Sequence, residues 1–362
     1  MTLSRDALRA SLSAVFVTAL SVFASCAKNS DTASNNSDLP YPVVPQGSGE
    51  VTGDKNFAQL MQSAAQGSVR PSPWAGYWWP YLDDGISIAA RLYERSIGKS
   101  GALSWEAQHH GSRVPGVQSW WGHCNGWAAA AVLFEEPKSS KAVNAVSFGV
   151  AEQKALYSEA AMEVSADFFG TRSNSDDSSD PAFQDVFPNQ FFLVLTNYVG
   201  HGFPLLMDRY TGQQVWNHPI AGYKIAPVQP SDSLGSDSRA PGVYRALVTV
   251  TLWWSRDDVE GGHVTEAFSF ADTASFQSRT LKMEVWLDAP LVFQGTTLKS
   301  SGNIILPRQG RTVTGGAWRN GGLAEVNSHP DYLWVPHAVM KSTGFSNPYI
   351  DPVWLNQLRS GS

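Results

Sequence analysis

The hydrophobic and polar positions first divide the N-terminal part of the chain from the rest. An apolar run from Leu12 through Phe23, preceded by two arginines, is typical of a secretion signal and is too short for a membrane-spanning helix. A stretch rich in Ser, Asn, Asp, Gly and Pro follows and has little apolar surface to bury. The pattern predicts a signal peptide over residues 1–25, a flexible stalk within residues 26–68, and a folded part after it.

The clearest helix pattern of the folded part begins at Cys124. Four consecutive alanines at 128–131 precede Val, Leu and Phe, and Pro137 follows the expected end of the helix. A second, amphipathic helix is predicted over 150–169, where apolar residues recur at helical spacing. We expect these two helices to pack side by side.

Strands are predicted from apolar and aromatic runs in the remaining chain. Residues 191–198 and 203–208 form two such runs after the second helix. Further strands are predicted from residue 243 onward, over 243–254, 264–270, 281–287, 304–306 and 313–318. The pattern indicates an α+β protein whose second half is antiparallel sheet.

Composition excludes several classes of protein. Hydrophobic residues make up 43% of the 362 residues and charged residues only 16%, which excludes a mainly disordered or coiled-coil chain. The net charge of −6 leaves no basic excess for a nucleic-acid partner. The sequence contains no phosphate loop, dinucleotide fingerprint or zinc-ligand spacing, so it predicts no metal ligand and requires no cofactor.

The first of the two cysteines belongs to targeting. Ala24, Ser25 and Cys26 end the apolar run and resemble a lipobox, where the signal is removed and the cysteine receives a lipid. Ordinary cleavage nearby is the alternative, and it would leave a periplasmic or secreted protein. We expect a bacterial outer-membrane lipoprotein, or a periplasmic or secreted protein, with the lipid anchor as its one contact with a membrane.

The second cysteine, Cys124, has no partner for a disulfide within the folded part, so it is a packing residue, an intermolecular linker or a reactive group. Its predicted place at a helix N-terminus stabilises a thiolate and offers backbone N–H groups to an oxyanion. Gly122 would leave room for a substrate, and neighbouring tryptophans would exclude water. Gln118 lies at the spacing of the oxyanion glutamine in papain-like enzymes.

Four Trp-rich motifs extend this pattern over residues 70 to 355. They are PWAGYWWP at 73–80, GHCNGWA at 122–128, VWNHPIAGYK at 215–224, and GGAW at 315–318 together with HPDYLWVP at 329–336. In these motifs the chain resembles the transglutaminase elicitor family of oomycetes and Vibrio-type bacteria. The third motif resembles the elicitor peptide for which the family is named.

The resemblance implies an elongated α+β fold with a papain-like core over 69–230 and a β-rich part over 231–362 that completes it. It also implies a transglutaminase, calcium-dependent in the characterised member, whose partners are proteins or peptides with Gln and Lys side chains. Cys124 matches the family's nucleophile, which attacks a glutamine amide and releases ammonia before a lysine amine or water resolves the thioester.

The resemblance to the family is weakest at the residue that should act as general base. Asp208 matches the orienting carboxylate, but Phe192 falls where the family has its histidine, and a phenyl ring accepts no proton. His201 and His329 are candidate substitutes. His123 is expected to be a packing or hydrogen-bonding residue, and no role is assigned to the other five histidines, His109, His110, His218, His263 and His337.

An Asp-containing segment, 171–181, is either a calcium-binding loop or an ordinary solvated loop. The leading hypothesis for function is a surface-anchored thiol acyl-transferase. A cysteine peptidase or amidase with the same core is one alternative, and a catalytically inactive binding protein of the envelope is the other.

Overall fold

The computed structural model describes residues 51–170, 172, 185–210, 212–237, 240–306, 315–319, 329–339 and 346–360, all within one compact unit of residues 36–362. The predicted signal peptide, Cys26 and nearly all of the proposed calcium loop lie outside the described residues. Among the helices that are described, none combines the length and apolar character needed to cross a membrane.

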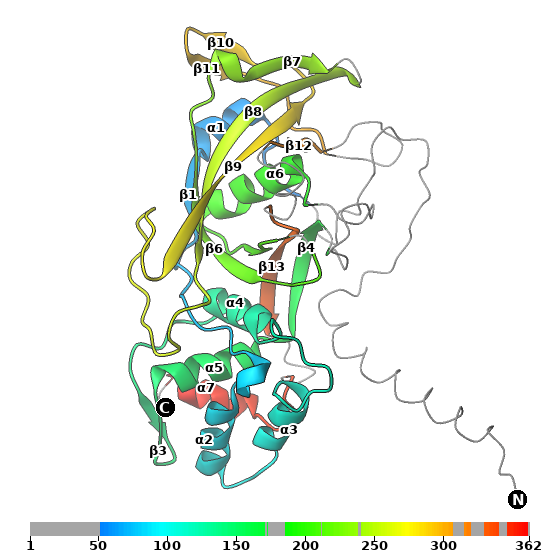
Figure 1. The fold of residues 1–362 in the computed structure, drawn as a ribbon. Helices are drawn as coiled ribbons and strands as arrows, with labels where there is room; N and C mark the ends of the chain where they lie inside the picture. Colours follow the sequence, from blue (N-terminus) through cyan, green and yellow to red (C-terminus); the bar gives the residue numbers. More distant parts are fainter. Residues whose placement is uncertain are drawn as a thin grey trace, which may run out of the picture. The chain divides into compact units, whose positions relative to one another are not determined.

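Most helices lie in the first half of the described chain and most strands in the second half (Figure 1). The helices are α1 (Phe57–Ser63), α2 (Ser87–Ile97), α3 (Ala102–His109), α4 (Cys124–Leu133), α5 (Val150–Ala160), α6 (Pro188–Tyr198) and α7 (Pro352–Ser360), with short 3-10 turns η2 (Tyr81–Asp83), η3 (Val199–His201) and η4 (Pro230–Asp232). The strands are β1 (Gln66–Ser68), β2 (Lys141–Val143), β3 (Val146–Phe148), β4 (Val164–Gly170), β5 (Leu206–Asp208), β6 (Asn217–Ile225), β7 (Ser233–Asp237), β8 (Ala240–Ser255), β9 (Phe276–Leu287), β10 (Val292–Gln294), β11 (Thr297–Ser300), β12 (Ala317–Trp318) and β13 (Tyr332–Val339).

One antiparallel sheet connects the two halves of the sequence. Its order in the described residues is β12-β9-β8-β6-β5-β13-β4, with β1 paired to β6 and β7 paired to β8. The hairpin of β8 and β9 is its longest pairing and runs from Tyr244 opposite Leu287 to Ser255 opposite Phe276. Because β6 pairs with β8 and β4 pairs with β13, the division expected at residues 230/231 falls inside one sheet.

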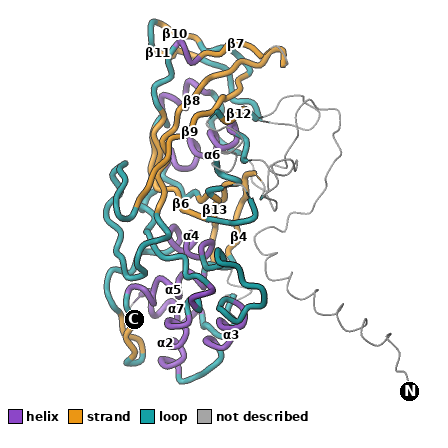
Figure 2. Tube along the Cα trace, viewed as in Figure 1, coloured by secondary structure: helices purple, strands orange, loops and turns teal. Residues whose placement is uncertain are grey.

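Helices α2, α3, α5 and α7 lie together on one side of α4, and the sheet lies on its other side (Figure 2). Residues Ala128–Ala131 of α4 are buried, and their small side chains let neighbouring elements approach closely. The closest approach is at Gly126, where an added Cβ would lie 2.2 Å from the backbone oxygen of Ser158 on α5. The predicted packing of the two helices is thus confirmed, and it makes α4 a rigid support for its first residue, Cys124.

One predicted strand is a helix in the structure. Residues 191–198, expected as a strand, belong to helix α6, which begins with Pro188 in its first turn, where a missing N–H costs nothing. The helix is buried along 188–196, and Phe192 packs on Phe57 at 5.5 Å between ring centroids. A helix buried on every side carries an unbroken apolar run, which periodicity alone does not separate from a strand.

The second predicted helix is also shorter than expected. Helix α5 ends at Ala160, and residues 164–170 form strand β4 instead of its last turns. Residues 264–270 are not a strand but belong to the loop that joins β8 to β9. This loop returns to the helices (Figure 1). There, Lys154 Nζ on α5 donates to His263 O at 2.7 Å.

The folded part begins before residue 69, so residues 56–68 do not belong to the predicted stalk. Phe57 and Leu60 of α1 are buried, and β1 pairs with β6, so the chain is already part of the fold from about residue 56. The predicted strands over 243–254 and 281–287 are confirmed as β8 and β9, whereas 203–208 and 313–318 contribute only short strands at their ends. The mixed arrangement of helices with an antiparallel sheet agrees with the predicted α+β class.

Candidate functional site

The nucleophile candidate Cys124 is the first residue of α4, as predicted. The segment before it is held by backbone pairing with the first Trp-rich motif: His123 N donates to Trp78 O at 2.7 Å, and Tyr81 N donates to Trp121 O at 2.9 Å. The helix N-terminus is therefore fixed from both sides, by α5 and by residues 78–81. The start of a helix carries partial positive charge, which favours an anion there.

The thiol lies next to the third Trp-rich motif. Cys124 Sγ donates to Val215 O at 3.4 Å, and the residue is 6% exposed. Trp216, the next residue, meets Trp78 edge to face with ring centroids 5.4 Å apart. Both tryptophans are half-buried, so the thiol is bordered by two segments that each present an aromatic ring.

Gly122 has a different role from the one expected. A Cβ built there would lie 2.5 Å from Trp78 Cε3 and 2.6 Å from Trp78 O. These distances are far shorter than ordinary contacts of about 3.5–4.0 Å between carbon atoms. The glycine is thus needed for the close approach of Trp78, and the space above it is filled by this protein's own ring rather than left for a substrate.

Asp208 ends strand β5 and lies on the other side of the same segment. Its Oδ1 accepts a hydrogen bond from Trp216 N at 2.8 Å, and its Oδ2 is buried without a hydrogen-bond partner. Burial raises the pKa of Asp208 to about 7, against the opposing charges of Arg172 and Arg209. Residues 215–216 thus contact both the thiol and the carboxylate, which brings the two predicted site residues into one region.

The other predicted site residues have contacts of their own. Gln118 is exposed, and its side-chain amide donates to Gly116 O at 2.8 Å within its own loop. His201 is exposed in η3, and its Nδ1 lies 3.0 Å from Asn197 O. His329 is buried, stacks on Trp318 at 4.4 Å between ring centroids, and places Nδ1 3.2 Å from Asp185 Oδ2.

A second group of chemically active side chains was missed in the sequence. We call it the His–Glu cluster; it consists of Glu106, His110, His123 and Glu159. Its members come from α3, the residue after α3, the residue before α4, and α5, and all four are buried. One donor atom of each lies within 4.8 Å of the others. The spacing of four between Glu106 and His110, which puts both on one helix face, was the available signal.

Charges within the His–Glu cluster oppose the cost of burial. Burial alone would raise the pKa of Glu106, but hydrogen bonds and charge from the two histidines lower it. Burial likewise disfavours the charged form of His110, but the two carboxylates raise its pKa. The pKa of His123 is raised for the same reason. Without an ion, the neighbouring carboxylates therefore favour the protonated forms of His110 and His123.

Calcium, which the family resemblance implied, does not suit this donor set. Calcium takes six to eight oxygen ligands in proteins, whereas half of the donors here are imidazole nitrogens. The Asp residues of segment 171–181 lie outside the described residues. The donor chemistry of the cluster suits a transition metal instead.

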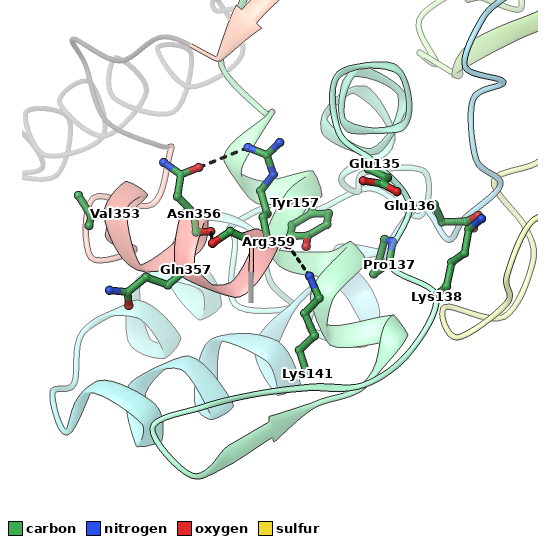
Figure 3. A pocket seen from close by; sticks show the side chains of 11 residues that line it. Glu135, Glu136, Pro137, Lys138, Lys141, Tyr157, Val353, Asn356, Gln357 and Arg359 are labelled. Carbon is green, nitrogen blue, oxygen red and sulfur yellow. Dashed lines mark hydrogen bonds between the residues drawn. The ribbon is translucent and has the colours of Figure 1, made fainter. Parts of the chain in front are cut away.

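A cavity of about 670 Å³ opens at the other end of α4 (Figure 3). Its walls come from residues 135–138, from Lys141 and from α7. Arg359 crosses it, stacking on Phe134 and accepting a hydrogen bond from Lys141 Nζ through its backbone oxygen. Because α4 has ten residues and is about 15 Å long, this cavity is separate from the Cys124 site.

Comparison with known proteins agrees with this architecture. Residues 102–240, which contain Cys124, Asp208 and the His–Glu cluster, match the transglutaminase elicitor family. The fold is similar to the crystal structure of the GP42 transglutaminase from Phytophthora sojae, with a TM-score of 0.59, 19% identity, and coverage of 85% of this chain and 94% of that chain. A search of curated proteins found no match. Residues 102–240 therefore match the family that the Trp-rich motifs indicated.

Proposed function

We propose that this protein is a thiol acyl-transferase that acts on glutamine side chains, with Cys124 as nucleophile. The observation that carries the proposal is the position of the thiol. It lies at the start of a helix whose N-terminus is held by backbone pairing, beside Trp78 and Trp216, and the adjoining backbone binds the Asp208 carboxyl. The similarity to a transglutaminase supports the same reaction class.

The proposed reaction has two steps. The thiol gives its proton to the general base, and the thiolate attacks the carbonyl carbon of a glutamine amide. The C–N bond then breaks to leave a thioester, and the base returns the proton to the departing NH2 group, which leaves as ammonia. The primary amine of a lysine then attacks the thioester, which forms the isopeptide bond and returns the thiol. N–H groups at the start of α4 would stabilise the oxyanion of both steps, and a papain-like arrangement of α4 with β5 and β6 would supply the carboxylate.

We propose His329 as the general base ahead of His201. Asp331 N donates to Asp208 O at 3.0 Å, so the segment of His329 lies beside the proposed orienting residue. His201 instead borders a separate cavity with Gln66 and Arg70. Replacing His329 with Asn is expected to lower the transfer rate by about 10²–10⁴-fold, while His201→Asn leaves the rate near that of the unmodified protein.

Incorporation of a fluorescent primary amine into a glutamine-containing protein tests the proposal. We expect incorporation by the purified protein and none by Cys124→Ala, with Gly262→Ala as a control because nothing lies within 4 Å of that glycine's added Cβ. Cleavage or plain deamidation of the substrate would instead support the peptidase or amidase alternative. Inactivity of the unmodified protein under all conditions would support the inactive binding protein.

We propose that the protein acts at a bacterial envelope, anchored by a lipid on Cys26. The apolar run over 12–23 and the small residues before Cys26 support this location. Its protein substrates would then be other surface or secreted proteins with exposed Gln and Lys side chains. Metabolic labelling with a fatty-acid analogue tests the anchor, and Cys26→Ala is expected to abolish the label.

A further inference from the structure

The His–Glu cluster is a set of buried, charged side chains that the proposed acyl transfer does not use. We propose that the His–Glu cluster binds a divalent transition-metal ion in a closed site that fixes the start of α4, and zinc is the metal we expect. This site does not depend on the proposed acyl transfer, because its donors would bind the ion whether or not Cys124 reacts.

Distances between the donor atoms fit tetrahedral coordination. His123 Nε2 lies 3.0 Å from Glu159 Oε2 and 3.7 Å from Glu106 Oε2. His110 Nδ1 lies 3.1 Å and 3.5 Å from the same two oxygens. Zinc bonds to nitrogen and oxygen of about 2.0–2.2 Å place neighbouring donors of a tetrahedron about 3.3–3.6 Å apart. Two of the four distances lie below this range, one lies within it and one lies above it, so small movements would complete the site.

Hydrogen bonds aim the carboxylates at the histidines. Asn347 binds both of them, since its side chain donates to Glu106 Oε1 and its backbone N–H donates to Glu159 Oε1, each at 2.7 Å. The two Oε2 atoms are thereby left to face the imidazoles, and Glu106 Oε2 is buried without a hydrogen-bond partner. Outer contacts of this kind orient the ligands of metal sites.

Contacts also fix the two imidazole rings. His123 Nδ1 lies 3.3 Å from Trp79 O, which leaves Nε2 for the centre of the cluster. Tyr81 stacks on the His110 ring at 5.2 Å and meets the His123 ring edge to face at 5.3 Å. Both rings are therefore held with one nitrogen directed at the carboxylates, as a bound ion requires.

Charge and chemistry favour a transition metal. A divalent ion with two carboxylates and two neutral imidazoles would form a site with no net charge. Imidazole suits zinc and neighbouring metals, whereas calcium and magnesium prefer oxygen. Four protein ligands with no exposed position are typical of a structural zinc site rather than a catalytic one.

Such an ion would join parts of the chain that are distant in sequence. It would connect α3, α5 and the residue before Cys124, and through Asn347 also the segment that leads to α7. The metal would act as a positioning element for the start of α4, outside any contact with a substrate. Its removal would loosen the helix N-terminus that carries the thiol.

The first test measures metal in the full-length protein as purified. Elemental analysis is expected to find about one zinc ion per chain. Dialysis against a chelator is expected to lower the melting temperature, and zinc or cobalt(II), but not calcium, should restore it. The cobalt(II) protein should show the intense visible absorption of a four-coordinate ion, a readout that a purely electrostatic cluster would not produce.

Variants locate the ion. His110→Gln combined with Glu106→Gln should abolish the bound metal, while His337→Gln, which removes a half-exposed surface histidine, should retain it. Absence of a transition metal together with a melting temperature insensitive to zinc and cobalt would overturn the proposal. Metal that persists in the double variant would also overturn the proposal. A six-coordinate cobalt spectrum in the unmodified protein would overturn it as well, and that measurement does not depend on the folding of any variant.

Discussion

Replacement of Asp208 by Asn tests the electrostatics of the candidate site. The pKa of Asp208 is raised by burial from 3.8 to about 7, a difference of about 3 pH units. Because the folded protein prefers the protonated carboxyl, this group's contribution to stability is fully present below about pH 3.8 and is lost as the pH rises through about 7. At about 1.4 kcal/mol for each pH unit, the free energy of unfolding should fall by about 4 kcal/mol across that window.

Asn has the shape of the protonated carboxyl and keeps an oxygen for the Trp216 N–H, but it does not ionise. We expect urea unfolding to find Asp208→Asn close to the unmodified protein at pH 4 and about 4 kcal/mol more stable at pH 8. Asp258→Asn is the control of opposite sign, since Arg256 lowers the pKa of Asp258. The reasoning is refuted if the pH profiles of Asp208→Asn and the unmodified protein are parallel.

Two further variants test packing near the thiol and the buried charge on α5. Gly122→Ala should lower the free energy of unfolding by about 1–3 kcal/mol, because the added methyl group overpacks against Trp78, and it should reduce amine incorporation. The control Gly262→Ala should change neither quantity. Equal melting temperatures for the two variants would contradict the contact between Gly122 and Trp78. Lys154→Met should lower the free energy of unfolding by about 3–5 kcal/mol, because the largely buried Glu136 loses its ion pair with Lys154 Nζ at 2.7 Å. Thermal denaturation should show that adding Glu136→Gln recovers part of this loss, and no recovery in the double variant would show that the pair is not coupled.

The sequence predicted the elements that local chemistry specifies. Helix α4 was predictable because an alanine run and Pro137 define it without reference to neighbours. The region shared by Cys124 and Asp208 was predictable through the family motifs. Helix α6 was not, because Phe191–Leu195 is apolar on every side, and only the surrounding sheet and α1 decide between a buried helix and a strand.

The His–Glu cluster shows the limit of reasoning from one sequence. Glu106 and Glu159 are 53 positions apart, and neither lies in a Trp-rich motif. His123 was expected to be a packing or hydrogen-bonding residue, and its buried ring does place Nε2 3.0 Å from Glu159 Oε2, but its carboxylate partners could not be foreseen. Such sites depend on how helices pack, and no spacing along the chain encodes that packing.

The most direct test of the central claim is mass spectrometry of the protein after incubation with a glutamine peptide and no amine acceptor. The account predicts an adduct on Cys124 equal to the peptide mass less one ammonia, which disappears when a primary amine is added and never forms with Cys124→Ala. An unmodified Cys124 under conditions where the fold is intact, or an adduct on another residue, would contradict it.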